Sequence, residues 1–199
     1  MNDDELESVQ RAVRLINSRG HAGAFAKKTR EDQISLEKLV AIEWTKSAQV
    51  AFGLNVSSLE HNLVDPPDCF AEIDGRKIAI ELTELVNSNL LDDIETYNRE
   101  NGLRVTSADR FYHHAQWNLE LFKTRLDERI DKKQESYEKR GIFVDVLVVH
   151  SDEPWLSPYH VETWISSLNF KARPNLFSVH FIQSYFPGYS KHWPIFRLY

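Results

Sequence analysis

The residues best suited to chemistry are two carboxylates, Asp68 and Glu81, which flank a predicted β-hairpin. The stretch PPDCFAEIDGRKIAIELTEL, residues 66–85, alternates apolar and polar side chains on either side of an Asp74-Gly75 step, which is typical of two strands joined by a two-residue turn. Pairing of the strands can bring Asp68 and Glu81 together. Two ionised carboxylates about 4 Å apart repel by roughly 4 kcal/mol at an effective dielectric constant of about 20, so the pair predicts a cation between them. Oxygen ligands favour Mg²⁺ or Mn²⁺.

Each acid also has a structural interpretation. Asp68 can simply end the turn that begins with Pro66 and Pro67. Glu81, which lies between Ile80 and Leu82, is harder to explain in this way because charged groups are rarely buried without a partner. The pair therefore indicates a function more strongly than either acid alone.

Two further charged residues interrupt the apolar stripes of predicted helices. The first helix of this kind runs from Ile34 to about Gly53, and the second runs from about Ala108, after a Ser107 cap, to Arg140 and Gly141. At helical spacing the first stripe is Leu36, Leu39, Val40, Glu43, Ser47 and Val50, and the second is Tyr112, Ala115, Leu119, Phe122, Leu126, Ile130, Lys133 and Tyr137. The charged residues of the two stripes are Glu43 and Lys133, and the spacing predicts that both point inward. The alternative to this inward orientation is that Glu43 is a solvated surface acid and that Lys133 extends its ammonium group into water.

The remaining elements complete an alternating order of helices and strands. They are a helix over 3–20, a polar connector, a strand within 53–60, a buried strand over 142–150, a helix from Ser157 with Pro158 in its first turn, and a strand over 176–186. This order predicts a mixed β-sheet with helices on both faces.

The motif around the hairpin resembles the metal-binding core of the PD-(D/E)xK nuclease superfamily. Pro67-Asp68 precedes the hairpin, and Glu81-Leu82-Thr83 follows an apolar strand. The order of elements is similar from about residue 34 to 150. The resemblance implies an α/β, restriction-endonuclease-like, three-layer α/β/α fold with a central mixed β-sheet and an N-terminal helical extension. Residues 1–33 would be the N-terminal helix and connector and 34–199 the nuclease domain, within one domain overall.

The resemblance also implies a set of site residues that differs from the usual motif at one position. Thr83 stands where the family's lysine is expected, and Lys133 is the candidate for the displaced cation. The spacing from Lys133 to Tyr137 is similar to the QxxxY of exonuclease-like members, which implies a supporting role for Tyr137.

The implied activity is the hydrolysis of phosphodiester bonds in nucleic acid, DNA more than RNA. Mg²⁺ or Mn²⁺ would be held by Asp68 and Glu81, assisted by Glu43 and by the carbonyl of Leu82. Thr83 would hydrogen-bond to the attacking water or to a phosphate oxygen, and Lys133 would orient the water or neutralise charge on the phosphate.

Two other functions stay open. A catalytically inactive module of the same fold could bind nucleic acid or a protein partner, because threonine cannot supply the cation of the motif and the net charge of the chain is −6. A metal-dependent hydrolase of small phosphoesters would have a closed pocket instead of an open groove. A homodimer or a partner protein could supply further substrate contacts.

Composition sets the remaining expectations. The chain has 199 residues, enough for one core, and its single cysteine, Cys69, excludes an internal disulfide and is interpreted as a packing residue. The apolar runs are too short to span a bilayer, and the N-terminus is charged, so we expect a cytoplasmic protein without membrane contact. Basic residues of the long helix either line a phosphate-binding side or form a solvated, ion-paired surface: Lys123, Arg125, Arg129, Lys132, Lys139 and Arg140.

Overall fold

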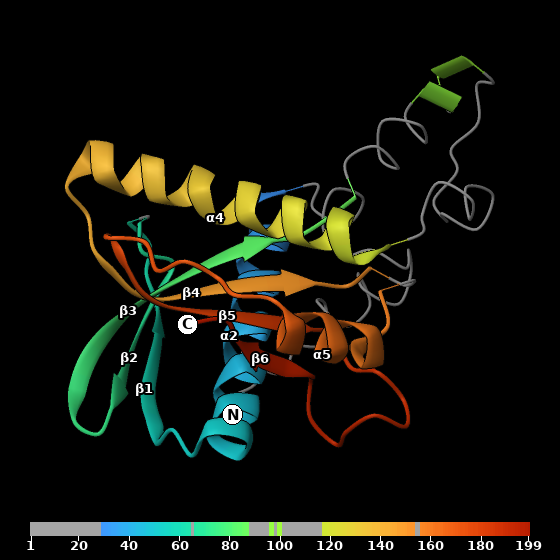
Figure 1. The fold of residues 1–199 in the computed structure, drawn as a ribbon. Helices are drawn as coiled ribbons and strands as arrows, with labels where there is room; N and C mark the ends of the chain where they lie inside the picture. The colour runs from blue at the N-terminus through green and yellow to red at the C-terminus, as the bar shows by residue number, and fades with distance from the viewer. Residues whose placement is uncertain (1–28, 65, 88–95, 98, 101–116, 154–155) are drawn as a thin grey trace.

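The chain folds around one mixed six-stranded sheet (Figure 1). The computed structural model describes residues 29–64, 66–87, 96–97, 99–100, 117–153 and 156–199. The strands lie in chain order across the sheet: β1 (Val56–His61), β2 (Cys69–Ile73), β3 (Arg76–Glu84), β4 (Val144–Ser151), β5 (Leu176–Gln183) and β6 (Ile195–Arg197). Strands β3, β4 and β5 are parallel, whereas β1, β2 and β6 pair in antiparallel fashion with their neighbours. The predicted mixed α/β architecture is confirmed.

Helices cover both faces of the sheet. They are α2 (Arg30–Phe52), α4 (Leu119–Arg140) and α5 (Pro158–Ser167). Helix α2 packs Ala41, Trp44 and Ala48 against the side chains of Ile80 and Val148. On the other face, α4 and α5 pack against alternate residues of the same strands, and the shared core includes Phe122, Leu126, Ile130, Leu147, Val149, Val161, Val179 and Phe181. None of the helices within the described ranges is long and apolar enough to cross a membrane.

The hairpin between β2 and β3 forms as predicted. Asp74 and Gly75 occupy its two turn positions with φ values of 51° and 79°, the left-handed region that this kind of turn requires. Cys69 pairs with Ile80 in the antiparallel register. The next pair outward is therefore Asp68 and Glu81, and the hairpin brings together the two acids that its sequence separates.

Two helices begin at residues other than those predicted. Helix α2 begins at Arg30 instead of Ile34, because Thr29 and Asp32 cap it reciprocally: each side chain accepts a hydrogen bond from the other residue's backbone N–H. Helix α4 begins at Leu119, where the side chain of Asn118 accepts a hydrogen bond from the N–H of Leu121 at 2.8 Å. The predicted cap Ser107 and the predicted helix over 3–20 lie outside the described residues.

The inward stripe of α2 is as predicted at Leu36, Leu39, Val40 and Ser47, which are buried, but its centre is rotated. Ala41, Trp44 and Ala48 are fully buried, whereas Val50, which was expected to face the core, is 65% exposed. The rotation moves Glu43 toward the margin of the buried face. In α4 the predicted residues Phe122, Leu126, Ile130 and Tyr137 are buried, whereas Leu119 is 39% exposed and Gln134 is more buried than Lys133. Tyr112 and Ala115 of the predicted stripe lie outside the described residues.

The C-terminal strands differ from expectation. Strand β5 ends at Gln183 instead of 186, and β6 was not predicted. Only three residues of β6 pair with β5, directly after Pro194. A segment this short has too little alternation to indicate a strand.

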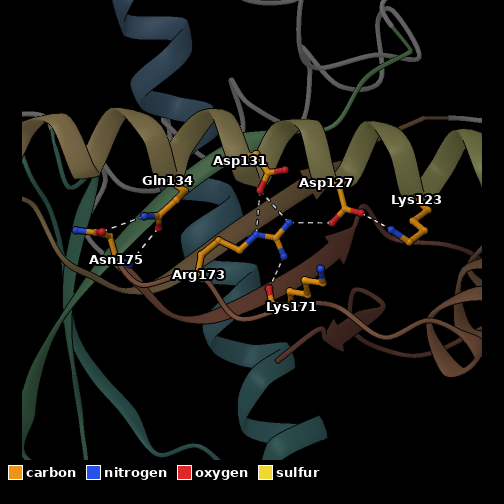
Figure 2. Close-up of polar contacts among 7 residues, drawn as sticks. All are labelled: Lys123, Asp127, Asp131, Gln134, Lys171, Arg173 and Asn175. Atoms are coloured by element: carbon orange, nitrogen blue, oxygen red, sulfur yellow. Dashed lines mark hydrogen bonds and ion pairs between the residues drawn. The ribbon is translucent and has the colours of Figure 1, made fainter.

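An arginine ties α4 to the segment before β5 (Figure 2). The guanidinium of Arg173 contacts the carboxylates of both Asp127 and Asp131, with nitrogen–oxygen distances of 3.1 Å and 2.8 Å, and also donates to the carbonyl of Lys171. Its side chain is only 13% exposed. The arginine therefore fixes this segment against the first half of the helix.

A second contact fixes the later half of α4. Gln134 and Asn175 are hydrogen-bonded reciprocally: the Gln134 amide donates to the Asn175 side chain at 2.9 Å, and the Asn175 N–H donates to Gln134 at 3.1 Å (Figure 2). Asn175 also donates to the carbonyl of Ile142, at 2.8 Å. Because Lys133 is adjacent to Gln134, these bonds help to set the rotation at which α4 presents that lysine to the sheet.

Candidate functional site

Asp68 and Glu81 lie together at the mouth of the hairpin, and both are buried, with exposed fractions of 8% and 2%. Ile80 and Leu82 point toward α2, so the alternation of β3 turns Glu81 toward α4. The N–H of Leu82 donates to Asp68 Oδ2 at 2.8 Å. The two carboxylates that the sequence singled out are therefore brought to one place.

The backbone around Asp68 is held by Asn62. The N–H of Asn62 donates to the carbonyl of Asp68 at 2.7 Å, and its side-chain amide donates to the carbonyl of Pro67 at 2.7 Å. Asp68 does follow the Pro-Pro turn, as its structural interpretation required. The turn also delivers its carboxylate to Glu81, so a structural role does not exclude a functional one.

The pKa of Asp68 is raised from 3.8 to about 7. Burial is the main cause, and repulsion by the carboxylate of Glu81 is the next. The Leu82 N–H lowers the pKa, Glu37 raises it, and Lys133 lowers it by a smaller amount. A carboxyl group in this state binds a proton or a cation more readily near neutral pH than an ordinary surface aspartate does.

Lys133 reaches the pair from the opposite layer. Its Nζ lies 2.5 Å from Glu81 Oε1, and its side chain is 28% exposed. Glu81 Oε2 is buried and has no hydrogen-bond partner among the described residues. The ring of Tyr137, which is 2% exposed, lies one turn further along, with its centroid 6.0 Å from the ammonium. Lys132 is exposed, as its position on the helix predicts.

An acid that sequence reasoning missed, Glu37, also acts on the site. Its Oε2 lies within hydrogen-bond distance of His61 Nε2, at 3.0 Å, and its charge raises the pKa of Asp68. His61 pairs with Cys69, the residue after Asp68, across β1 and β2. The available signal was helical spacing, because Glu37 precedes the buried Ala41 and Trp44 by four and seven residues.

The other predicted site residues have more modest surroundings. Glu43 forms an ion pair with Lys46 at 2.7 Å, one turn along α2. Thr83 lies two residues beyond Glu81 on the same face of β3 and is half-buried. The roles of Glu43 and of the Leu82 carbonyl as metal ligands, and that of Thr83 in catalysis, stay predictions.

Cys69 takes no part in this chemistry. Burial, followed by the nearby charge of Asp68, raises the pKa of its thiol to about 12. The thiolate that would act as a nucleophile or a metal ligand is therefore strongly disfavoured. The packing role predicted for Cys69 agrees with its 1% exposure among core side chains of the α2 face.

The donor set fits a hard divalent cation in part. Two facing carboxylates, one with a buried oxygen that has no hydrogen-bond partner among the described residues, offer the oxygen ligands that Mg²⁺ and Mn²⁺ prefer. Within the described ranges, however, no three His, Cys, Asp or Glu side chains converge as a ready ligand group. A cation here would take its remaining ligands from backbone, water or substrate, as Mg²⁺ commonly does.

The chain matches no protein-family model, no curated protein and no solved structure.

Proposed function

We propose that the protein is a divalent-metal-dependent nuclease of PD-(D/E)xK type, with a restriction-endonuclease-like fold, that hydrolyses phosphodiester bonds of DNA. One observation carries the proposal. The buried carboxylates of Asp68 and Glu81 face each other at the end of a hairpin, and the Lys133 ammonium lies 2.5 Å from Glu81. Two acids and one cation are the charges that metal-assisted phosphodiester hydrolysis requires.

A structural ion pair alone would not need both acids. One lysine can neutralise Glu81, but Asp68 then remains as a second buried carboxyl group whose pKa is raised to about 7. Keeping such a group costs folding free energy when it is ionised. Such unfavourably buried carboxylates are common at functional sites, where a bound cation or substrate compensates their charge.

The residues of the site divide the chemistry between them. Mg²⁺ or Mn²⁺, when bound, supplies a water of lowered pKa and a positive charge beside the phosphate. Asp68 and Glu81 hold and orient that cation. Lys133 donates to a phosphate oxygen and neutralises the negative charge that develops on it, and the Thr83 hydroxyl hydrogen-bonds to the attacking water or to a phosphate oxygen.

A second candidate is a catalytically inactive module of the same fold that binds nucleic acid or a protein. The contact between Lys133 and Glu81 favours it, because a lysine that already neutralises the second acid reduces the demand for a cation. The lack of a three-residue ligand group within the described ranges favours it as well. The two functions differ in whether metal binds.

Calorimetric titration of the wild type with Mn²⁺ and Mg²⁺, alongside cleavage of DNA and RNA substrates, tests the proposal. Asp68→Ala and Glu81→Ala should abolish both metal binding and cleavage, whereas Lys133→Ala should abolish cleavage and retain metal binding. Glu72→Ala is the matched control, because Glu72 lies on β2 close in sequence to Asp68 but near the exposed side chain of Ser58.

The outcomes separate the candidates. Metal-dependent cleavage that is lost with Asp68 and Glu81 but kept with Glu72 supports the nuclease. A folded wild type that binds no metal at millimolar concentration and cleaves neither polymer contradicts the nuclease and leaves the binding module. Hydrolysis of a small phosphodiester without cleavage of either polymer would indicate the small-phosphoester hydrolase.

A further inference from the structure

Helix α4 carries three cations on one side, in the turns that precede Lys133. Arg125, Arg129 and Lys132 are spaced by four and three residues, so they line one face of the helix over about 10 Å. Lys133, which contacts Glu81, follows immediately. The row of cations therefore leads toward the carboxylate pair.

These cations surround a cavity next to the strand that carries Glu81. The cavity has a volume of about 150 Å³ and is lined by Leu85, Val86, Arg125, Glu128, Arg129 and Lys132. Leu85 directly follows the last residue of β3, and its N–H donates to the carbonyl of His150 at 2.7 Å. Leu85 is four positions after Glu81, and four residues of extended chain span about 13 Å. A strand of a few nucleotides could therefore reach from the cavity to Glu81.

The three cations of this row differ in their ion pairing. Arg129 and Lys132 take part in none of the ion pairs between described residues. Arg125, the first cation of the row, pairs with Glu128 at 3.0 Å. By contrast, Lys123 and Arg173, on the side of α4 drawn in Figure 2, are bound to Asp127 and Asp131.

The ligand chemistry follows from the lining. Among the described residues that line the cavity, Arg129 and Lys132 stand outside every ion pair, and on a chain whose net charge is −6 they form a local site for a polyanion. The described residues that line the cavity include no aromatic ring on which a base could stack. Leu85 and Val86 offer apolar contact for sugars instead. Contacts of this kind bind phosphate and sugar and do not read sequence.

We propose that Arg129 and Lys132 bind the phosphate backbone of a DNA strand and guide it to Asp68 and Glu81. The proposal rests on the proposed function, because it assigns the substrate-holding surface of that same site. Contacts with the phosphate backbone depend neither on the base sequence of the DNA nor on a bound metal. DNA binding can therefore be measured without cleavage.

The test is fluorescence anisotropy with a labelled DNA oligonucleotide in EDTA, over a series of salt concentrations. R129A/K132A should bind on the order of tenfold or more weakly, and the slope of log affinity against log salt should become shallower by about two. K171A/K191A removes the same charge from two exposed lysines elsewhere and should bind like the wild type.

The other possible outcomes bear separately on the phosphate-binding surface and on the nuclease function. If both double variants bind DNA equally weakly, net charge alone determines the affinity. If R129A/K132A binds DNA like the wild type, these residues do not hold the phosphates, even if the wild type cleaves DNA. If R129A/K132A loses DNA binding but the wild type neither binds metal nor cleaves DNA, the phosphate-binding surface is supported and the nuclease function is contradicted. A wild type that binds no DNA in EDTA would overturn the surface.

Discussion

The ammonium of Lys133 lies 2.5 Å from Glu81 Oε1, although 52 positions of sequence separate the two residues. The contact joins the α4 layer to the central sheet at β3, the strand that carries Glu81. In the proposed nuclease, Lys133 would supply from α4 the cation that the motif lacks at Thr83. The nuclease and the inactive module both depend on this pair.

Replacement of Lys133 by alanine should destabilise the fold. Glu81 would keep its burial and lose its counter-charge, which lowers the free energy of unfolding by about 1–3 kcal/mol, less than for a fully buried pair because the lysine is partly exposed. Denaturant unfolding at pH 7 measures the loss. Lys132→Ala, an exposed neighbour, should change stability by less than about 0.5 kcal/mol. Equal stability of the two variants would contradict a stabilising ion pair.

Glu37 and Glu43 should differ in their effect on Asp68. Glu37→Gln removes a negative charge that raises the pKa of Asp68, so that pKa should fall below its wild-type value of about 7. Glu43→Gln, on the same helix, removes a charge already paired with Lys46 and should shift it less. Carbon-13 NMR titration of the Asp68 carboxyl group reports both values. A larger shift from Glu43→Gln would restore the acid that the sequence favoured.

The stability of the metal-free protein should fall as pH rises through the titration of Asp68. A folded-state pKa raised from 3.8 to about 7 means that the folded protein holds this proton more tightly than the unfolded chain does. Stability from this group is complete below pH 3.8 and is lost by about pH 7, a change of up to about 4 kcal/mol.

Asp68→Asn isolates this contribution. The variant cannot ionise at that position, so its unfolding free energy should exceed that of the wild type at pH 8 and approach it at pH 4. Chemical denaturation at the two pH values provides the comparison. A wild type that gains stability relative to Asp68→Asn between pH 4 and 8 would show that the carboxylate is favourably solvated.

Metal affinity should depend on the same proton. A cation competes with the proton on Asp68, so Mn²⁺ binding should strengthen by roughly fivefold from pH 6 to pH 7 and level off above the pKa of about 7. Calorimetry in buffers of different ionisation enthalpy should also detect a proton released on binding. Binding that is independent of pH over this range would exclude Asp68 as a ligand.

The bonds between Gln134 and Asn175 should support both stability and the position of Lys133. Gln134→Ala leaves two polar groups of the buried Asn175 without their partner and should cost about 1–3 kcal/mol. Glu135→Ala, an exposed neighbour on α4, should be nearly neutral. Thermal or denaturant unfolding distinguishes them. If Gln134→Ala and Glu135→Ala have the same free energy of unfolding, water replaces the hydrogen bonds of Gln134 without loss of stability.

Local pattern was enough to predict the hairpin and the meeting of its two acids. Strand alternation and the Asp74-Gly75 turn fix the register within a few residues, so Asp68 and Glu81 were placed together before any tertiary contact was known. The strand over Val144–Ser151 and the helix beginning at Pro158 were predicted for the same reason. Their apolar content, turns and caps are all encoded by neighbours in sequence.

The rotation of each helix against the sheet was decided only by tertiary packing. Spacing alone allowed either Glu37 or Glu43 to face the core of α2, and the burial of Trp44, whose indole N–H donates to His180 on β5 at 3.0 Å, selects the rotation that brings Glu37 toward Asp68. The three-residue strand β6 likewise depends on β5 for its pairing. Such contacts join segments that are distant in sequence.

The sequence by itself thus determined the two carboxylates, the hairpin that joins them and the mixed sheet with helices on both faces. Tertiary structure decided which cation reaches Glu81, which acid of α2 acts on Asp68, and which residues of α4 line the cavity beside β3. The physical reason is one of range. Turn geometry and side-chain periodicity act over a few residues, whereas helix rotation, burial and pKa depend on side chains that only folding brings together.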